Sequence, residues 1–197
     1  MTTNIPQSRT VLGLFDTFES AQHAVQALID NGFMADNVSL VAHDPQQHLV
    51  KQYGGTGESS EGTTVGATGG AVIGGVSGLL ASIGTLTIPG IGPVLAAGSL
   101  ATALGATALG AGLGAAAGGI VGALLGMGVS EEEAGSFAEG VRRGGTLVIV
   151  DAADGMVDRA YAILNEHGAI DMNERTGQWR QSGWTAYDPR LSPHEEQ

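Results

Sequence analysis

The sequence predicts an α+β protein: a split ferredoxin-like βαββαβ domain with an inserted Gly/Ala-rich helical hairpin. Three observations lead to this prediction. Residues 62–130 form a block of 69 residues without Asp, Glu, Lys, Arg or His. A strand–helix–strand pattern precedes the block, and a second one follows it. Two such units in series give a four-stranded antiparallel sheet with two helices on one face.

The first βαβ half covers residues 9–44. RTVLGLFD is a β-rich run, and Asp16 or Thr17 can cap a helix whose apolar residues recur at intervals of three and four. Gly32 suits the left-handed position that ends this helix, and NVSLVAHD follows as a second strand. Residues 45–61 read as a linker.

The second βαβ half covers residues 146–174. TLVIVDA is a strand, Asp154 can cap the next helix, Gly168 can end it, and AIDMNE (169–174) is expected to form the last strand. The runs VLGLF and TLVIV are apolar on both faces, but the two predicted helices cover only one. The other face needs a cover, from the 131–143 helix, the tail or a second protomer, and we expect a homo-oligomer.

The glycines of residues 62–130 predict a glycine-zipper helical hairpin. In two runs, from Gly62 to Gly78 and from Gly110 to Gly126, a glycine occurs at every fourth residue. Residues four apart lie on one ridge of an α-helix. Each mid-helix glycine costs about 1 kcal/mol in water, a loss that close helix–helix packing can offset. A Pro/Gly-rich turn at 88–93 separates the two segments, with Pro89, Gly90, Gly92 and Pro93 as its helix breakers. The expected packing and oligomerisation residues are Gly62, Gly66, Gly70, Gly74, Gly78, Gly110, Gly114, Gly118, Gly122 and Gly126.

The hairpin can be placed in a membrane or in a soluble assembly. Residues 63–84 and 94–127 would form helices of roughly 33 Å and 50 Å, against a hydrocarbon core of about 30 Å. The apolar content of the first segment is marginal for insertion, and the flanks lack an aromatic belt and a clear Lys/Arg excess. The favoured prediction is a hairpin in the cytoplasmic membrane, with lipid as a partner and both flanks facing the cytoplasm. The alternative is a soluble cytoplasmic particle or filament; the N-terminus has no secretory signal pattern.

Two further segments complete the chain. Residues 131–145 predict a short amphipathic helix, with Ser130 and Glu133 as a capping box and the acids of its first turn complementing the helix dipole. Residues 175–197 form a tail that carries both Trp residues and no periodicity, so it is either a docked strap or partly disordered.

No motif indicates an enzyme, and we expect neither a catalytic residue nor a cofactor. The absence of Cys excludes disulfides, thiolate metal sites and a Cys nucleophile, and a net charge of −12 disfavours nucleic-acid binding. There is no P-loop, and the interval-four register explains GAGLGA better than a dinucleotide loop does. We expect no metal site, because the carboxylates of Asp151, Asp154 and Asp158 suit a helix start and the histidines are dispersed. These are His23, His43, His48, His167 and His194.

Three tracts resemble the bacterial general stress protein family: TIPGIGPVLAAG (87–98), GAAAGGIVGALLGMGVSEEEA (114–134) and AEGVRRGGTLVIVDA (138–152). The resemblance implies a small α+β domain interrupted by a glycine-zipper hairpin. It also implies a non-enzymatic, stress-associated protein of the kind described as a predicted membrane protein. No catalytic residue is carried over, and a small-molecule ligand stays open.

Overall fold

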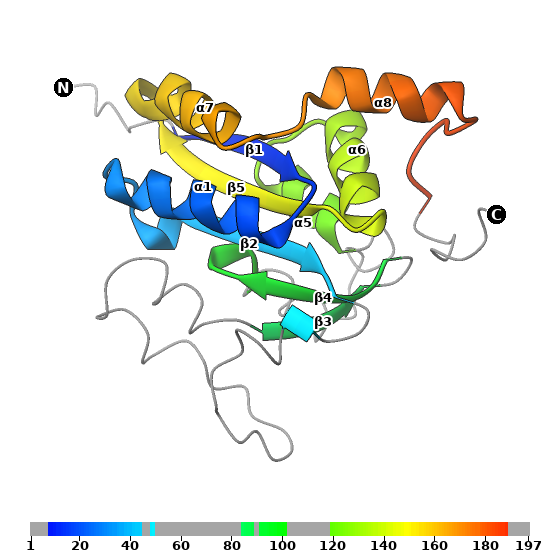
Figure 1. Cartoon of the computed structure of the whole chain (residues 1–197), viewed down its shortest axis with the longest axis horizontal. Coiled ribbons are helices and arrows are strands. Elements are labelled where there is room, and N and C mark those ends of the chain that lie inside the picture. Colours follow the sequence, from blue (N-terminus) through cyan, green and yellow to red (C-terminus); the bar gives the residue numbers. More distant parts are fainter. Residues whose placement is uncertain (1–7, 45–47, 50–83, 89–90, 102–118, 189–197) are drawn as a thin grey trace, which may run out of the picture.

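The computed structural model describes residues 8–44, 48–49, 84–88, 91–101 and 119–188. A five-stranded sheet lies at its centre, and every neighbouring pair of strands is antiparallel (Figure 1). The α+β class and the antiparallel sheet are therefore confirmed. In spatial order the strands are β1 (Ser8–Phe15), β5 (Thr146–Ala153), β2 (Val38–His43), β4 (Gly92–Ala97) and β3 (Gly84–Ile88).

The first βαβ half forms the two strands β1 and β2 with a helix between them, and the two strands are not neighbours in the sheet. Helix α1 (Phe18–Asp30) starts where Thr17 accepts a hydrogen bond from the backbone N of Ser20 at 3.2 Å, and Gly32 follows it at φ +93°. The 3₁₀ turn η1 (Ala35–Asn37) leads into β2. Strand β5 lies between β1 and β2 and is antiparallel to both, so β1 and β2 run parallel to each other.

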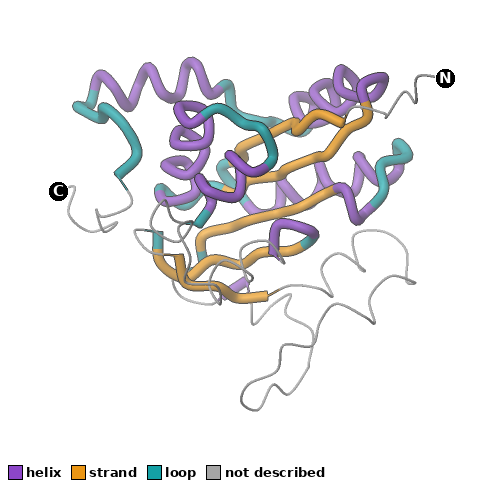
Figure 2. Tube along the Cα trace, turned by 180° about the vertical axis from the view of Figure 1, so that it is seen from behind, coloured by secondary structure: helices purple, strands orange, loops and turns teal. Residues whose placement is uncertain are grey.

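The sheet is apolar on both faces because helices cover both (Figures 1 and 2). Helices α1 and α7 (Val157–Glu166) pack on the face that carries Phe15 and Val148. Helices α5 (Ile120–Gly126) and α6 (Glu131–Arg142) pack on the opposite face. The cover required by VLGLF and TLVIV thus comes from within the chain, and this face does not call for a second protomer.

The predicted strand over residues 169–174 is wrong. The backbone N of Ile170 donates to the carbonyl oxygen of Leu14 at 2.8 Å, along the outer side of β1. At the next residue the side chain of Asp171 accepts from the backbone N of Asn173 and of Glu174, which starts helix α8 (Met172–Gln181). An N-cap carboxylate therefore ends the extended segment, and the fourth strand of a ferredoxin-like sheet does not form.

The predicted turn at 88–93 joins strands instead of helices. Ile88 faces Gly92 in a β-hairpin, where Gly92 adopts φ +97° and Ile91 donates its N–H to the carbonyl oxygen of Ile88. Gly92 and Pro93 therefore act in a turn as predicted, but residues 94–97 extend along β2 as part of β4. Pro89 and Gly90 lie outside the described residues. The centre of the charge-free block belongs to the sheet.

The start of the last βαβ helix also differs from the prediction. Asp154 begins a 3₁₀ turn, η3 (Asp154–Met156), and α7 starts at Val157 without a side-chain cap. The carboxylate of Asp154 instead lies 3.1 Å from Nε of Arg9. Gly168 ends α7 at φ +87°, in the left-handed conformation expected of it. Among the described residues, no helix combines the length and the apolar character needed to cross a bilayer.

Candidate functional site

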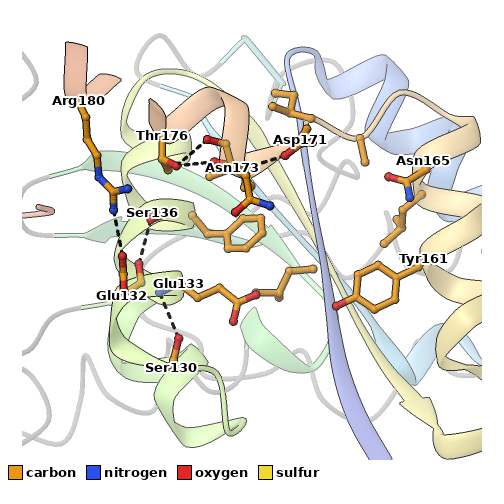
Figure 3. Close-up of a pocket in the computed structure, with 16 residues that line it drawn as sticks. Ser130, Glu132, Glu133, Ser136, Tyr161, Asn165, Asp171, Asn173, Thr176 and Arg180 are labelled. Carbon is orange, nitrogen blue, oxygen red and sulfur yellow. Dashed lines mark hydrogen bonds and ion pairs between the residues drawn. The ribbon is translucent and has the colours of Figure 1, made fainter. Parts of the chain in front are cut away.

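A half-open cleft lies between α6, α7 and α8, beside β1 (Figure 3). Its volume is about 610 Å³, which falls in the range of small-molecule sites. Apolar side chains form part of the lining: Leu12 and Phe137 are buried in the face under α6, and Leu164 is buried in the face under α7. The polar lining comes from Ser130, Glu132, Glu133, Ser136, Tyr161, Asn165, Asp171, Asn173, Thr176 and Arg180.

Two of the three helices that border the cleft, α6 and α8, begin at it. Ser130 caps α6 by accepting from the backbone N of Glu133 at 3.3 Å, the first half of the predicted capping box. Asp171 caps α8 in the same way, at 2.8 Å from the backbone N of Asn173. Each cap satisfies a backbone N–H that the helix itself leaves without a partner. Capping therefore explains why carboxylates and hydroxyls gather at this cleft.

Several polar groups of the cleft are already engaged within the chain. Ser136 Oγ donates to the carbonyl oxygen of Glu132 at 2.9 Å, and Thr176 Oγ1 donates to that of Met172 at 2.6 Å. Arg180 Nη2 lies 3.0 Å from Glu132 Oε1 (Figure 3). The lining contains no His or Lys that would activate a hydroxyl as a nucleophile. The hydroxyls of Ser136 and Thr176 therefore donate to backbone carbonyls, and the polar groups of the cleft can bind polar molecules.

A buried ion cluster lies at the C-terminal end of α6. Arg142 Nε and Nη2 donate to the two carboxylate oxygens of Glu139 at 2.8 and 2.9 Å, and Arg143 also contacts this carboxylate. The Glu139 side chain is fully buried, and that of Arg142 is 4% exposed. The Arg143 guanidinium lies 5.1 Å from the ring centre of Trp179 in α8, a cation–π contact. The cluster therefore links α6 to α8.

The first part of the tail docks on this cluster. Trp184 packs edge-on against Trp179, with their ring centres 5.7 Å apart, and Tyr187 packs beside Gly135 of α6. Nε1 of Trp184 and Oη of Tyr187 are buried and form no hydrogen bond within the described part of the chain. Burial raises the pKa of Tyr187 to about 12; Arg142 opposes the rise, and the carboxylates of Glu139 and Asp188 add to it. As far as residue 188, the tail is a helix followed by a docked strap.

Most of the predicted zipper residues lie outside the described residues: Gly62, Gly66, Gly70, Gly74, Gly78, Gly110, Gly114 and Gly118. Gly122 and Gly126 lie in α5, which packs Ile120 and Leu124 on the sheet. Gly126 is exposed, and a Cβ built on it meets nothing within 4 Å. Within the described chain, Gly126 is therefore not a point of close helix contact.

The described histidines are spread over the fold. His23 lies in α1, His43 ends β2, and His167 follows α7. Asp44 is buried and accepts a hydrogen bond from the backbone N of His48 at 2.8 Å, so it caps a local turn. The described residues contain no group of three potential metal ligands. His194 lies outside the described residues.

Sequence reasoning missed the α6–α8 cleft. A strand over 169–174 would have placed Asp171 and Asn173 in the sheet, so no cleft was expected there. The signal for it was Asp171, with Glu174 three residues later, which is the same capping pattern as Ser130 with Glu133.

Comparison with models of protein families finds a match over the first part of the chain. Residues 10–93 match the model of the heat induced stress protein YflT domain. This match supports the resemblance to a bacterial general stress protein family and a stress-associated role. It covers most of β1, all of α1, β2 and β3 and the start of β4, and it ends before α5. Searches of curated proteins and of solved structures gave no significant match.

Proposed function

We propose that this chain is a non-enzymatic, stress-associated protein whose glycine-rich segments self-associate while the α+β domain holds their ends. The match of residues 10–93 to a heat induced stress protein domain carries the stress role. The regular glycine interval carries the self-association, because it places small residues on one helix ridge. Both zipper segments lie largely outside the described residues, so this part of the proposal rests on their sequence and on where they are anchored.

The sheet anchors the glycine-rich segments at both ends. β3 and β4 lie in the middle of the charge-free block, and β4 pairs with β2, with His43 opposite Val94. Residues 50–83 are therefore joined to the sheet domain at both ends, after β2 and before β3, and residues 102–118 connect β4 to α5 of the same domain.

This anchoring supports the soluble assembly over the transmembrane hairpin. A two-span hairpin needs the 88–93 turn on the far side of the bilayer, but this turn joins β3 to β4, and β4 pairs in the sheet with β2. A segment that starts and ends on one domain must cross an even number of times, and two crossings need about 40 residues. Residues 50–83 supply 34 and residues 102–118 supply 17. We therefore propose that the segments meet those of other copies outside the bilayer.

Sedimentation and membrane fractionation of the full chain test this proposal. The wild type should sediment at several times 19.8 kDa without detergent, and a carbonate wash should leave little protein in the membranes. The double variant Gly70→Leu/Gly118→Leu should sediment as a smaller species, because bulky side chains separate the helix ridges. Gly155→Leu is the matched control, since Gly155 is exposed and a Cβ there meets nothing within 4 Å. Retention in washed membranes would reject the soluble assembly, and unchanged sedimentation of the double variant would reject the zipper.

A further inference from the structure

Strand β3 is an edge of the sheet without a second strand partner in the described part of the chain. It pairs with β4 on one side, and the sheet order ends with it. Its outer side presents the backbone groups that an antiparallel neighbour would bind. Thr85 and Thr87 point their exposed side chains to one face, while Ile88 is buried on the other, among the residues under α5. Among the described residues, β3 is therefore paired on one side and has no strand on the other.

The β3 edge lacks the charges that normally protect a sheet edge. Natural proteins place Lys or other charged residues on such strands, and β1, the opposite edge, carries Arg9 and is followed by Asp16. No charged residue occurs between residues 62 and 130, which includes β3 and its sequence neighbours. Because the chain has a net charge of −12, two copies repel each other over most of their surface. A charge-free edge is the place where that repulsion is weakest.

The sequence of β3 also fits a symmetric pairing. Thr85-Leu86-Thr87 reads the same in both directions, so a two-fold axis at Leu86 sets Thr85 opposite Thr87 of the second copy. Thr–Thr pairs across antiparallel strands are favourable, and Gly84 would face Ile88, which leaves room for the larger side chain. An isologous contact of this kind closes on itself as a dimer.

We propose that the β3 edge pairs antiparallel with β3 of a second copy, about a two-fold axis at Leu86, to join two five-stranded sheets. The inference rests on the proposed self-association and names a contact for it that is separate from the glycine ridges. In the larger assembly, edge pairing would form dimers and the glycine-rich segments would connect them.

Cysteine cross-linking of the full chain tests the register. The protein contains no Cys, so an introduced thiol can form a disulfide only with an introduced thiol of another chain. A mixture of Thr85→Cys and Thr87→Cys chains, one carrying a size tag, should form a disulfide-linked heterodimer under mild oxidation. The two thiols would sit on directly opposite residues, within reach of a disulfide. Each variant alone should cross-link at least ten-fold more slowly, because like positions are offset along the strands. Ser8→Cys, on the edge strand β1, is the control and should stay monomeric.

Equal cross-linking in the mixture and in the single variants, or none in either, would overturn the edge pairing. Thr87→Lys gives a second reading: it adds a charge at an exposed position, so it should reduce dimerisation at least ten-fold while the circular dichroism spectrum stays unchanged. Unchanged dimerisation of a folded Thr87→Lys chain would also contradict the proposal.

The same mixture in the Gly70→Leu/Gly118→Leu background separates this inference from the proposed function. If cross-linking is retained and the assemblies are smaller than those of the wild type, the result would support both the edge pairing and the glycine zipper. Cross-linking lost with large assemblies retained would overturn the edge pairing. Cross-linking retained with large assemblies would support the edge pairing and reject the zipper.

Discussion

At the scale of single residues, Glu139 is the carboxylate on which the end of α6 depends. It is fully buried and forms ion pairs with two guanidinium groups, one of them also buried. Glu139→Gln should lower the free energy of unfolding by about 3–5 kcal/mol, because it leaves the Arg142 charge without its carboxylate. Urea unfolding followed by circular dichroism measures the loss. Glu132→Gln is the control: its ion pair with Arg180 is exposed, so the change should stay below about 1 kcal/mol. A similar small effect at both positions would contradict this view of the cluster.

Tyr187 makes the stability of the fold depend on pH, and the substitution Tyr187→Phe can isolate this effect. Its pKa is about 12 in the folded chain and near 10 when unfolded, so between these values the folded state binds more protons. The stability due to this raised pKa is complete below pH 10 and is lost as the pH rises toward 12. Tyr187→Phe should flatten that slope and leave stability at pH 7 unchanged or slightly higher, because the buried hydroxyl has no hydrogen-bond partner in the described chain. Absorbance titration and urea unfolding at several pH values check both expectations, and an unchanged slope would assign the effect to other groups.

At the scale of elements, the contact between β4 and β2 depends on a glycine. Gly98 follows β4 at φ +84°, and an added Cβ would overlap the backbone of Val38 and Ser39. Gly98→Ala should therefore destabilise the fold by about 2–4 kcal/mol, from backbone strain and overpacking together. Gly177→Ala is the matched control, because its Cβ meets nothing within 4 Å in α8 and alanine favours a helix by about 1 kcal/mol. Thermal unfolding of the two variants should shift in opposite directions.

The sequence correctly predicted those elements for which the apolar pattern and the residues at the ends indicate the same structure. β1, α1, β2, α6 and β5 combine apolar periodicity with a cap or a turn residue at their ends. Two segments gave conflicting signals. AIDMNE contains an Asp whose capping of α8 outweighs a short apolar run, and TLTIPGIGPV lies between glycines whose interval favoured a helix. The Thr–Leu–Thr–Ile alternation before Pro-Gly was the available sign of a β-hairpin. The cleft was missed because it depends on α8.

At the scale of the whole molecule, β5 determines how much of the chain is needed to fold. The match to the stress protein domain ends at residue 93, but β5 lies between β1 and β2. A chain ending at residue 93 would leave β1 and β2 without the strand that joins them and would expose both core faces. We expect this truncation to be unfolded or aggregated, as measured by circular dichroism and amide hydrogen exchange. A cooperatively folded 1–93 fragment would show that the matched region forms its own sheet.

Deletions separate the folded domain from the glycine-rich segments. Removing residues 62–130 would delete β3, β4 and α5 and expose the core under α6, so this variant should not fold. Replacing only residues 50–83 with a ten-residue Gly/Ser linker keeps every strand of the sheet. His43 faces Val94 and Gly84 faces Ala96, so the Cα atoms of His43 and Gly84 lie about 12 Å apart, a distance that residues 44–49 and a ten-residue linker together span easily. The second variant should unfold cooperatively and sediment as a smaller species than the wild type, because the β3 edge is intact and the first glycine ridge is gone. Large assemblies from that variant would place the self-association outside residues 50–83.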